Sequence, residues 1–153
     1  MCKHIDYMNR KDMVIFMVFN KIVFNVAGVT FENRQGKLWN LRKAELDKNR
    51  KQKVWLSLRR EKTNMRDSNA IAVIAHVPGA KQPAFKIGYV PANIASWLAP
   101  RMDAGLMVRV YAKQNGAPFV HGGHGANLGV TIKVVYQLMD SELARVPLLA
   151  EED

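Results

Sequence analysis

One stretch in the middle of the chain decides its fold, and it reads Arg59-Arg60-Glu61-Lys62-Thr63-Asn64-Met65-Arg66-Asp67-Ser68-Asn69-Ala70-Ile71-Ala72-Val73. A run of cations leads into a polar turn, and the turn leads into an apolar segment typical of a buried strand. Short Asn and Asp side chains tolerate unusual backbone angles and bond to nearby main-chain groups, so they favour a rigid bend between two strands. Such a bend, flanked by cations, is suited to an oxygen-rich anionic partner, and nucleic acid is the first to consider.

The charge of the whole chain favours the same class of partner. The chain has 153 residues, a formal charge of +10 and a pI of about 10.0, which suits one basic domain of ordinary globular composition. Residues 34–66 hold twelve Lys and Arg against three acids, a local balance of +9. A solvated cationic surface explains this cluster as readily as a binding surface does.

The N-terminal segment carries little functional information. Cys2 is the single cysteine and cannot form an internal disulfide, which favours a reducing, cytoplasmic location. The apolar run at residues 13–19 is too short to span a bilayer, and the following Asn20 and Lys21 end it before any convincing signal-peptide cleavage site. We expect residues 1–20 to form an extension or an extra strand, with residues 13–19 leading into the first strand.

The remaining sequence is predicted to be mainly β. Expected strands lie at residues 21–30, 54–59, 70–77, 85–90, 106–113 and 128–138, with a short surface helix at 37–48. The main helix opens at Pro91, the favoured first position, and Pro100 is expected to kink or split it. About six strands, one main helix and one short extra helix predict a small barrel over residues 21–138. Residues 139–153 are expected to form a tail whose acidic end has no stable structure.

Five motifs then occur in an order that resembles a known family. They are Gly28-Val29-Thr30-Phe31-Glu32-Asn33-Arg34-Gln35, Leu58-Arg59-Arg60-Glu61, Asn64-x-x-Asp67-x-Asn69-Ala70-Ile71-x-Val73, Ile87-Gly88-Tyr89-Val90-Pro91, and Ala95-x-x-Leu98-Ala99-Pro100 followed by Asp103-x-Gly105. Together they closely resemble the HIRAN domain over roughly residues 23–136. That resemblance implies a modified OB-type β-barrel. The family occurs attached to DNA-repair helicases and nucleases, and also as stand-alone proteins of prokaryotes and their viruses, which this chain resembles.

The resemblance also implies a pocket for a DNA end, because the family member in the helicase-like transcription factor binds the 3′ end of single-stranded DNA. Phe31 falls where the family places a ring that stacks on a terminal base. Asp67 falls where a carboxylate accepts a hydrogen bond from the 3′ hydroxyl and repels a 3′ phosphate. Thr63 and Asn64 would bond to the terminal sugar or phosphate, and Tyr89 would offer a hydroxyl or a ring to the backbone.

The residues by themselves leave two of these assignments open. Phe31 alone is typical of a core aromatic, and Asp67 alone is as typical of a backbone cap as of a ligand-binding group. The chain also departs from the helicase-type domain. Arg66 replaces a second stacking tyrosine, and Thr30 and Ala92 replace cations, so selectivity for a 3′ hydroxyl is open. The displaced phosphate contacts are expected at Arg34, Arg60, Lys62 or Lys86, or are lost.

No catalytic or metal site is predicted. His121 and His124 lie in a glycine-rich segment, but two histidines without further ligands make an incomplete zinc site. Glu61 and Asp67 supply too few carboxylates for metal-dependent cleavage of a phosphodiester, and no phosphate-binding glycine loop or nucleophile elbow is present. We therefore expect a protein that is not an enzyme and needs no cofactor.

Two hypotheses of different classes remain. The favoured one is a non-catalytic module of DNA repair or replication that binds single-stranded DNA or frayed ends, including the 3′-hydroxyl end, without base-sequence specificity. It would act in the cytoplasm, on the nucleoid or in a virus-infected cell, with a helicase or nuclease working in trans. The alternative is a viral or mobile-element adaptor that docks on a host DNA-processing or defence complex through Trp55 and the methionine-rich N-terminus. The sequence leaves DNA versus RNA, oligomeric state and the true translation start open.

Overall fold

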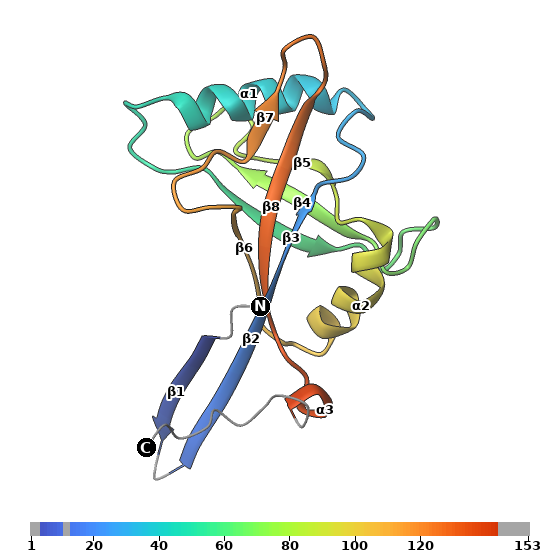
Figure 1. The fold of residues 1–153 in the computed structure, drawn as a ribbon. Helices are drawn as coiled ribbons and strands as arrows, with labels where there is room; N and C mark the ends of the chain where they lie inside the picture. Colours follow the sequence, from blue (N-terminus) through green and yellow to red (C-terminus); the bar gives the residue numbers. More distant parts are fainter. Residues whose placement is uncertain (1–3, 11–12, 144–153) are drawn as a thin grey trace.

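The computed structural model describes residues 4–10 and 13–143, with side chains described from residue 17 onward (Figure 1). In chain order the elements are β1 (His4–Arg10), β2 (Met13–Asn25), α1 (Arg34–Leu46), β3 (Trp55–Arg60), β4 (Ile71–His76), β5 (Ala84–Tyr89), α2 (Ala92–Asp103), β6 (Val108–Ala112), β7 (Val120–Gly122), β8 (Leu128–Gln137) and α3 (Asp140–Leu143). The polar stretch from Arg59 to Val73 is therefore the end of β3, a turn and the start of β4.

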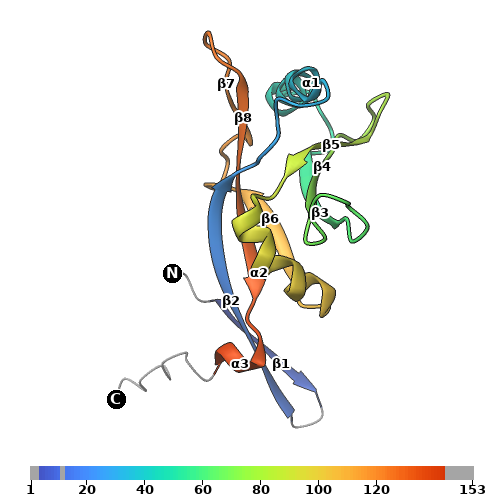
Figure 2. The ribbon, with the colours of Figure 1, turned by 90° about the vertical axis from the view of Figure 1, so that its right-hand side faces the viewer.

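The strands form two antiparallel sheets. The larger sheet has the order β1-β2-β8-β6, with β7 also paired to β8, and the smaller has the order β3-β4-β5 (Figures 1 and 2). Along β8, every second residue is buried, from Leu128 through Val130 and Ile132 to Val134, while the residues between them are partly exposed. This alternation is the period of a strand with one face on the core. β4 has no such alternation, because Ile71 to Ala75 are all buried between its two neighbours and the helices.

The two sheets share one hydrophobic core but do not close into a barrel within the described residues. They are joined by a bridge between Ala27 and Tyr89, whose backbone groups exchange hydrogen bonds of 2.8 and 2.9 Å. The bridge needs Gly88, since a Cβ there would lie 2.4 Å from the carbonyl oxygen of Ala27. β3 lies beside β6 on the other side without a hydrogen-bonded ladder between them. The mainly β prediction is confirmed, but the OB-like barrel is not.

The helices complete the core. Leu38, Leu41 and Ala44 form the buried face of α1, which begins three residues before the expected helix. α2 is one continuous helix, so the expected split at Pro100 is wrong. The ring removes a single N–H near the end of the helix, where only three residues follow it, and the lost hydrogen bond does not break the element. The segment predicted as a tail begins with the short helix α3.

The N-terminal segment joins the larger sheet where the structure describes it. Residues 13–19 are the first part of β2, and β1 pairs with them in register from His4 opposite Phe19. The acidic residues 151–153 and Cys2 lie outside the described residues. No helix within residues 4–10 and 13–143 is both long and apolar enough to cross a membrane.

Candidate nucleic-acid interface

A pocket of about 780 Å³ lies between the loop that follows β2, the β3–β4 turn and the end of β5. We call it the interloop pocket. It brings together six of the predicted site residues, which come from three separate parts of the sequence: Phe31, Arg34, Asn64, Arg66, Asp67 and Tyr89. The Ala27–Tyr89 bridge holds two of its walls together, so its shape depends on the junction between the sheets.

Phe31 is the exposed apolar side chain of this pocket. Its side chain is 66% exposed, so its interpretation as a core residue is wrong. The next two residues, Glu32 and Asn33, both have left-handed backbone angles, with φ of 55° and 59°. Such angles are disfavoured for residues other than glycine and persist where surrounding contacts enforce them. An aromatic ring held in water on a constrained loop is available for stacking.

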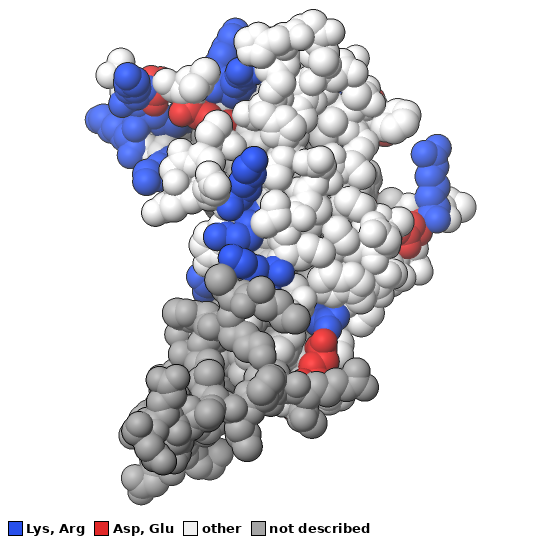
Figure 3. Space-filling model, in the orientation of Figure 1, with Lys and Arg blue, Asp and Glu red and all other residues white. Residues whose placement is uncertain are grey.

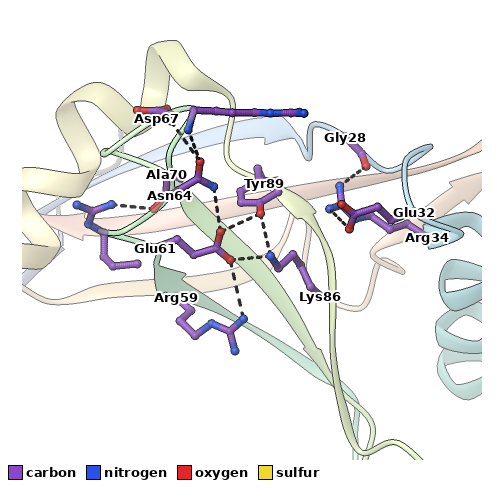
Figure 4. Close-up of polar contacts among 12 residues, drawn as sticks. Gly28, Glu32, Arg34, Arg59, Glu61, Asn64, Asp67, Ala70, Lys86 and Tyr89 are labelled. Carbon is purple, nitrogen blue, oxygen red and sulfur yellow. Dashed lines mark hydrogen bonds and ion pairs between the residues drawn. The ribbon is translucent and has the colours of Figure 1, made fainter.

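Arg34 supplies those surrounding contacts. Its guanidinium is buried, and it donates hydrogen bonds to the carbonyl oxygen of Gly28 at 2.7 Å and to Oε2 of Glu32 at 3.0 Å. It also lies over the ring of Tyr89, with 5.4 Å from Cζ to the ring centroid. Figure 4 shows Arg34 directed back at its own loop. Arg34 therefore positions the loop that carries Phe31, and its role as a phosphate contact stays a prediction.

The β3–β4 turn is held by its own polar side chains. Oδ1 of Asn64 accepts hydrogen bonds from the backbone N–H groups of Arg66 (3.0 Å) and Asp67 (3.2 Å). Oδ1 of Asp67 accepts one from the N–H of Asn69 at 2.8 Å. Each oxygen acts as a local cap, as short polar side chains do in turns. Among the described residues, Oδ2 of Asp67 has no hydrogen-bond partner, and this oxygen remains for a ligand.

A cluster beneath the turn was missed by the sequence analysis. Oε1 of Glu61 accepts hydrogen bonds from the Tyr89 hydroxyl (2.8 Å) and from Nδ2 of Asn64 (3.2 Å), and Oε2 lies 2.6 Å from Nζ of Lys86. Lys86 also donates to the Tyr89 oxygen at 2.8 Å (Figure 4). Glu61 had been considered only as an incomplete metal ligand. No sequence signal identifies its partners Lys86 and Tyr89, which lie on β5.

These contacts favour the charged forms of Glu61 and Lys86. Burial by itself would raise the pKa of the Glu61 carboxyl, but the hydrogen bonds from Lys86, Tyr89 and Asn64 outweigh it and lower that pKa. Burial would likewise lower the pKa of Lys86, but Glu61 and Tyr89 outweigh it and raise that pKa. Tyr89 thus donates its hydroxyl hydrogen to Glu61. The hydroxyl oxygen accepts a hydrogen bond from Lys86 and can interact with a ligand only as an acceptor.

Three predicted site residues lie outside the pocket. Every guanidinium nitrogen of Arg60 is engaged, with Asp103 at 2.9 and 3.1 Å and with the carbonyl oxygens of Ala70 and Ser68 at 2.7 and 2.9 Å. These bonds give Arg60 a structural role in the β3–β4 turn, and its expected contact with a phosphate stays a prediction. Lys62 is exposed and lies 3.7 Å from Asp103, and Thr63 is exposed in the turn.

The walls of the interloop pocket carry a nearly balanced charge. Arg34 and Arg66 are matched by Glu32 and Asp67. The excess of Lys and Arg lies elsewhere. In Figure 3 the cationic side chains gather over the C-terminal end of α1 and in a column over β6. The pocket is thus built for shape and hydrogen bonding more than for charge.

The histidines do not form a metal site in the described part of the chain. Nε2 of His121 lies 2.7 Å from the hydroxyl oxygen of Thr131. His76 stacks on Trp55 and shares a hydrogen bond with Ser57, contacts that give it a structural role. Within residues 17–143 no three side chains of His, Cys, Asp or Glu gather as metal ligands would.

A comparison with protein families gives the pocket its context. The model of the HIRAN domain matches residues 21–141, which include the interloop pocket, the smaller sheet and the larger sheet apart from β1 and the first part of β2. The chain belongs to the HIRAN family. HIRAN domains are known as nucleic-acid-binding modules, and this agrees with a basic protein that presents an exposed ring beside a polar turn. Neither the curated proteins nor the solved structures contain a match to this chain.

Proposed function

We propose that this HIRAN domain binds the end of a single DNA strand, or a frayed duplex end, in the interloop pocket and catalyses no reaction. The observation that carries the proposal is the exposed ring of Phe31 in the same pocket as the unpartnered Oδ2 of Asp67. A ring and a carboxylate on two constrained segments match the two chemical features of a strand end, an exposed base face and a terminal hydroxyl.

Each pocket residue has a distinct part in this binding. The terminal base stacks on Phe31, an interaction worth roughly 1–3 kcal/mol for any base. Asp67 accepts a hydrogen bond from the 3′ hydroxyl, and its charge opposes a phosphate at the same position. Arg66 stacks on the next base or binds its phosphate. Glu61 and Lys86 keep Tyr89 in place at the rear wall, where its oxygen meets the sugar or backbone.

The arrangement of the two sheets and the need for a partner enzyme fit this function. The two sheets, joined at one side by a bridge and open at β3 and β6, fit an opened variant of the OB-like barrel expected from the family. A module that only holds an end needs an enzyme in trans, and a helicase or nuclease working on the same cytoplasmic or nucleoid DNA, or on viral DNA, would supply the reaction.

The test is fluorescence anisotropy with labelled single strands that end in a 3′ hydroxyl, end in a 3′ phosphate, or are circular and have no end. Wild-type protein should bind the 3′-hydroxyl strand most tightly. Phe31→Ala should lower that affinity about 5- to 150-fold and leave binding to the circle unchanged. Tyr111→Ala is the control, because it removes a 45% exposed ring from β6, away from the pocket.

Two results would contradict the proposal. Equal affinity of the wild-type protein for open and circular strands would exclude end binding. Unchanged end preference in a folded Phe31→Ala, Asp67→Ala double variant would place end binding outside this pocket.

Trp55 supports the adaptor hypothesis as a second candidate. Its side chain is 51% exposed, yet its ring is held flat against His76, with 3.7 Å between ring centroids and 7° between planes. Exposed, rigid tryptophans are frequent anchors of protein interfaces. If this surface carries the function, Trp55→Ala should abolish capture of a partner protein while Phe31→Ala leaves it intact. The methionine-rich N-terminus has no described side chains before residue 17.

A further inference from the structure

A second hollow, separate from the interloop pocket, lies between α1, the loop after α1 and the β4–β5 turn. Its volume is about 660 Å³, and we call it the α1 groove. Figure 2 shows the β4–β5 turn extending outward beside α1, which is viewed almost along its axis. Four cations line the groove, namely Lys37, Lys43, Arg50 and Lys81, and Asp47 is its one acidic lining residue.

These four cations have no acidic partner among the residues that the structure describes. Within residues 17–143, the acids that form ion pairs do so with Arg34, Arg59, Arg60, Lys62, Lys86 and Arg101, none of which lines the α1 groove. Lys48, Lys51 and Lys53 on the adjoining loop are also exposed and unpaired in the described structure. Among the cations of the charge run at residues 34–66 that have no ion pair in the described structure, Lys37, Lys43 and Arg50 line the groove, whereas Arg66 lines the interloop pocket.

The groove is a built feature of the fold. Arg50 donates from Nη1 to the carbonyl oxygen of Pro78 at 2.7 Å, which ties the loop after α1 to the β4–β5 turn. Its Nε is buried and has no hydrogen-bond partner among the described residues. The apolar residues of the groove, Val77 and Phe85, are 4% and 8% exposed. A ligand in this groove therefore meets cationic side chains above a floor of buried apolar residues.

We propose that the α1 groove is a second nucleic-acid site, which binds the phosphate backbone whether or not the strand has an end. Unpaired Lys and Arg release counterions when they contact phosphates, and this supplies sequence-independent affinity. An acidic protein is the other polyanion to consider. Protein interfaces are depleted of Lys and rely on exposed apolar or aromatic anchors, whereas protein–DNA interfaces are polar and strongly positive. The polar, strongly positive lining of the groove matches that of a protein–DNA interface.

The two sites lie near enough for one nucleic acid to reach both. α1 connects them, because Arg34 at its first position lines the interloop pocket and Lys37 and Lys43 line the groove. Nine residues of helix from Arg34 to Lys43 correspond to about 13 Å. Backbone binding in the groove and end binding in the pocket are then separable contributions, one dependent on salt and the other on the chemistry of the end.

The test compares two triple variants that lose the same charge. The groove variant removes three of the four groove cations and is Lys37→Gln, Lys43→Gln, Lys81→Gln. The control variant removes three exposed cations from β2, β6 and the loop after β6 and is Lys21→Gln, Arg109→Gln, Lys113→Gln. The probe is a labelled circular single strand, which has no end for the interloop pocket, titrated over a range of salt concentrations. The groove variant should bind about tenfold or more weakly, and its log–log salt slope should fall by about two. The control variant should retain nearly full affinity and slope.

The charge-conserving variant Lys37→Arg, Lys43→Arg, Lys81→Arg should bind the circle like the wild type, provided that its thermal unfolding is unchanged. Equal losses in the two glutamine variants would overturn the proposal, since the affinity would then follow net charge alone. Unchanged binding in the groove variant would overturn it as well. Displacement of the circle by poly-glutamate at the same phosphate-equivalent concentration would assign the groove to acidic proteins. Preference of the groove variant for a 3′ hydroxyl over a 3′ phosphate tests the interloop pocket separately.

Discussion

Tyr89 donates its hydroxyl hydrogen to Oε1 of Glu61 across 2.8 Å, and this bond joins the last residue of β5 to the residue that follows β3. Lys86 completes the cluster with 2.6 Å to Oε2 of the same carboxylate. Both Glu61 and Lys86 have side chains that are less than one third exposed, so solvent screens the pair only partly. The cluster links the polar turn to β5 of the smaller sheet and supports the rear wall of the interloop pocket.

Replacing Glu61 by Gln should therefore destabilise the protein in a pH-dependent way. Because the folded pKa of Glu61 lies below its ordinary value of 4.5, its contribution is fully present above that pH and is lost as the pH falls through the folded value. At neutral pH, Glu61→Gln should lower the free energy of unfolding by about 1–3 kcal/mol. Thermal unfolding over a pH series would show the wild type and the variant converge in acid.

Lys86 gives the opposite dependence on pH and serves as an internal check. Its folded pKa lies above 10.5, so its contribution is present below that pH and is lost as the pH rises through the folded value. The Glu61→Gln variant should accordingly show a weaker loss of stability in alkali than the wild type. A constant difference between the two proteins from acid to alkali would mean that the cluster contributes by shape alone.

Gly88→Ala should separate the two sheets at the interloop pocket. The added Cβ would lie 2.4 Å from the Ala27 carbonyl oxygen and 2.7 Å from Cγ1 of Val26, distances that require the backbone to move. Overpacking of this kind costs about 1–3 kcal/mol. Gly36→Ala is the matched control, because no atom lies within 4 Å of its added Cβ and its site is helical. It should stabilise the protein by about 0.5–1 kcal/mol. Denaturant unfolding of both variants measures the contrast, and equal effects would contradict the close approach at Gly88.

Arg60→Lys should reduce stability without reducing affinity for DNA. Lysine keeps the charge but cannot reach Asp103, Ala70 and Ser68 together as the guanidinium does. The unfolding temperature should fall by several degrees, while anisotropy at a temperature where the variant is folded should give wild-type affinity. Arg59→Lys is the control on the same strand. The Arg59 side chain is 61% exposed, and its ion pair with Glu61 is long, at 4.0 Å from Nη2 to Oε2. This substitution should therefore leave the unfolding temperature unchanged. A loss of DNA affinity confined to folded Arg60→Lys would identify Arg60 as a phosphate contact.

The contrast between Arg59 and Arg60 shows where prediction from the sequence ends. The turn from Asn64 to Asn69 was predictable because its bonds connect residues two or three apart, and the strand β8 was predictable from its alternation. Which of two adjacent arginines points to solvent depends on the strand's facing partners, which the local pattern does not contain. The small barrel was expected from the number of strands, because strand periodicity does not say whether β3 and β6 pair.

Some residues of the candidate site were predictable from the sequence and others were not. Phe31 and Asp67 were placed by resemblance, and the structure brings them into one pocket, although the residues alone favoured a core position for Phe31. Glu61 was missed because its partners Lys86 and Tyr89 lie on β5, and only the sheet brings them together. The charge run at residues 34–66 looked like one surface, but some of its cations, such as Arg60, are held in ion pairs, and others, such as Lys37 and Lys43, line the α1 groove.

Asp67→Asn should relax the discrimination between a 3′ hydroxyl and a 3′ phosphate. Asparagine keeps Oδ1 as the acceptor for the N–H of Asn69, so the turn is retained, but the negative charge at Oδ2 is removed. The repulsion of a terminal phosphate then disappears, and its binding should improve by about tenfold relative to the hydroxyl end. Asp47→Asn is a close control, because Oδ1 of Asp47 also accepts from the N–H two residues ahead, at 3.0 Å, and the residue lies in the α1 groove. It should raise the affinity for both strands equally. Anisotropy with the two strands at constant salt separates these cases, and equal gains for both strands in Asp67→Asn would show that Asp67 acts through general charge and not on the strand end.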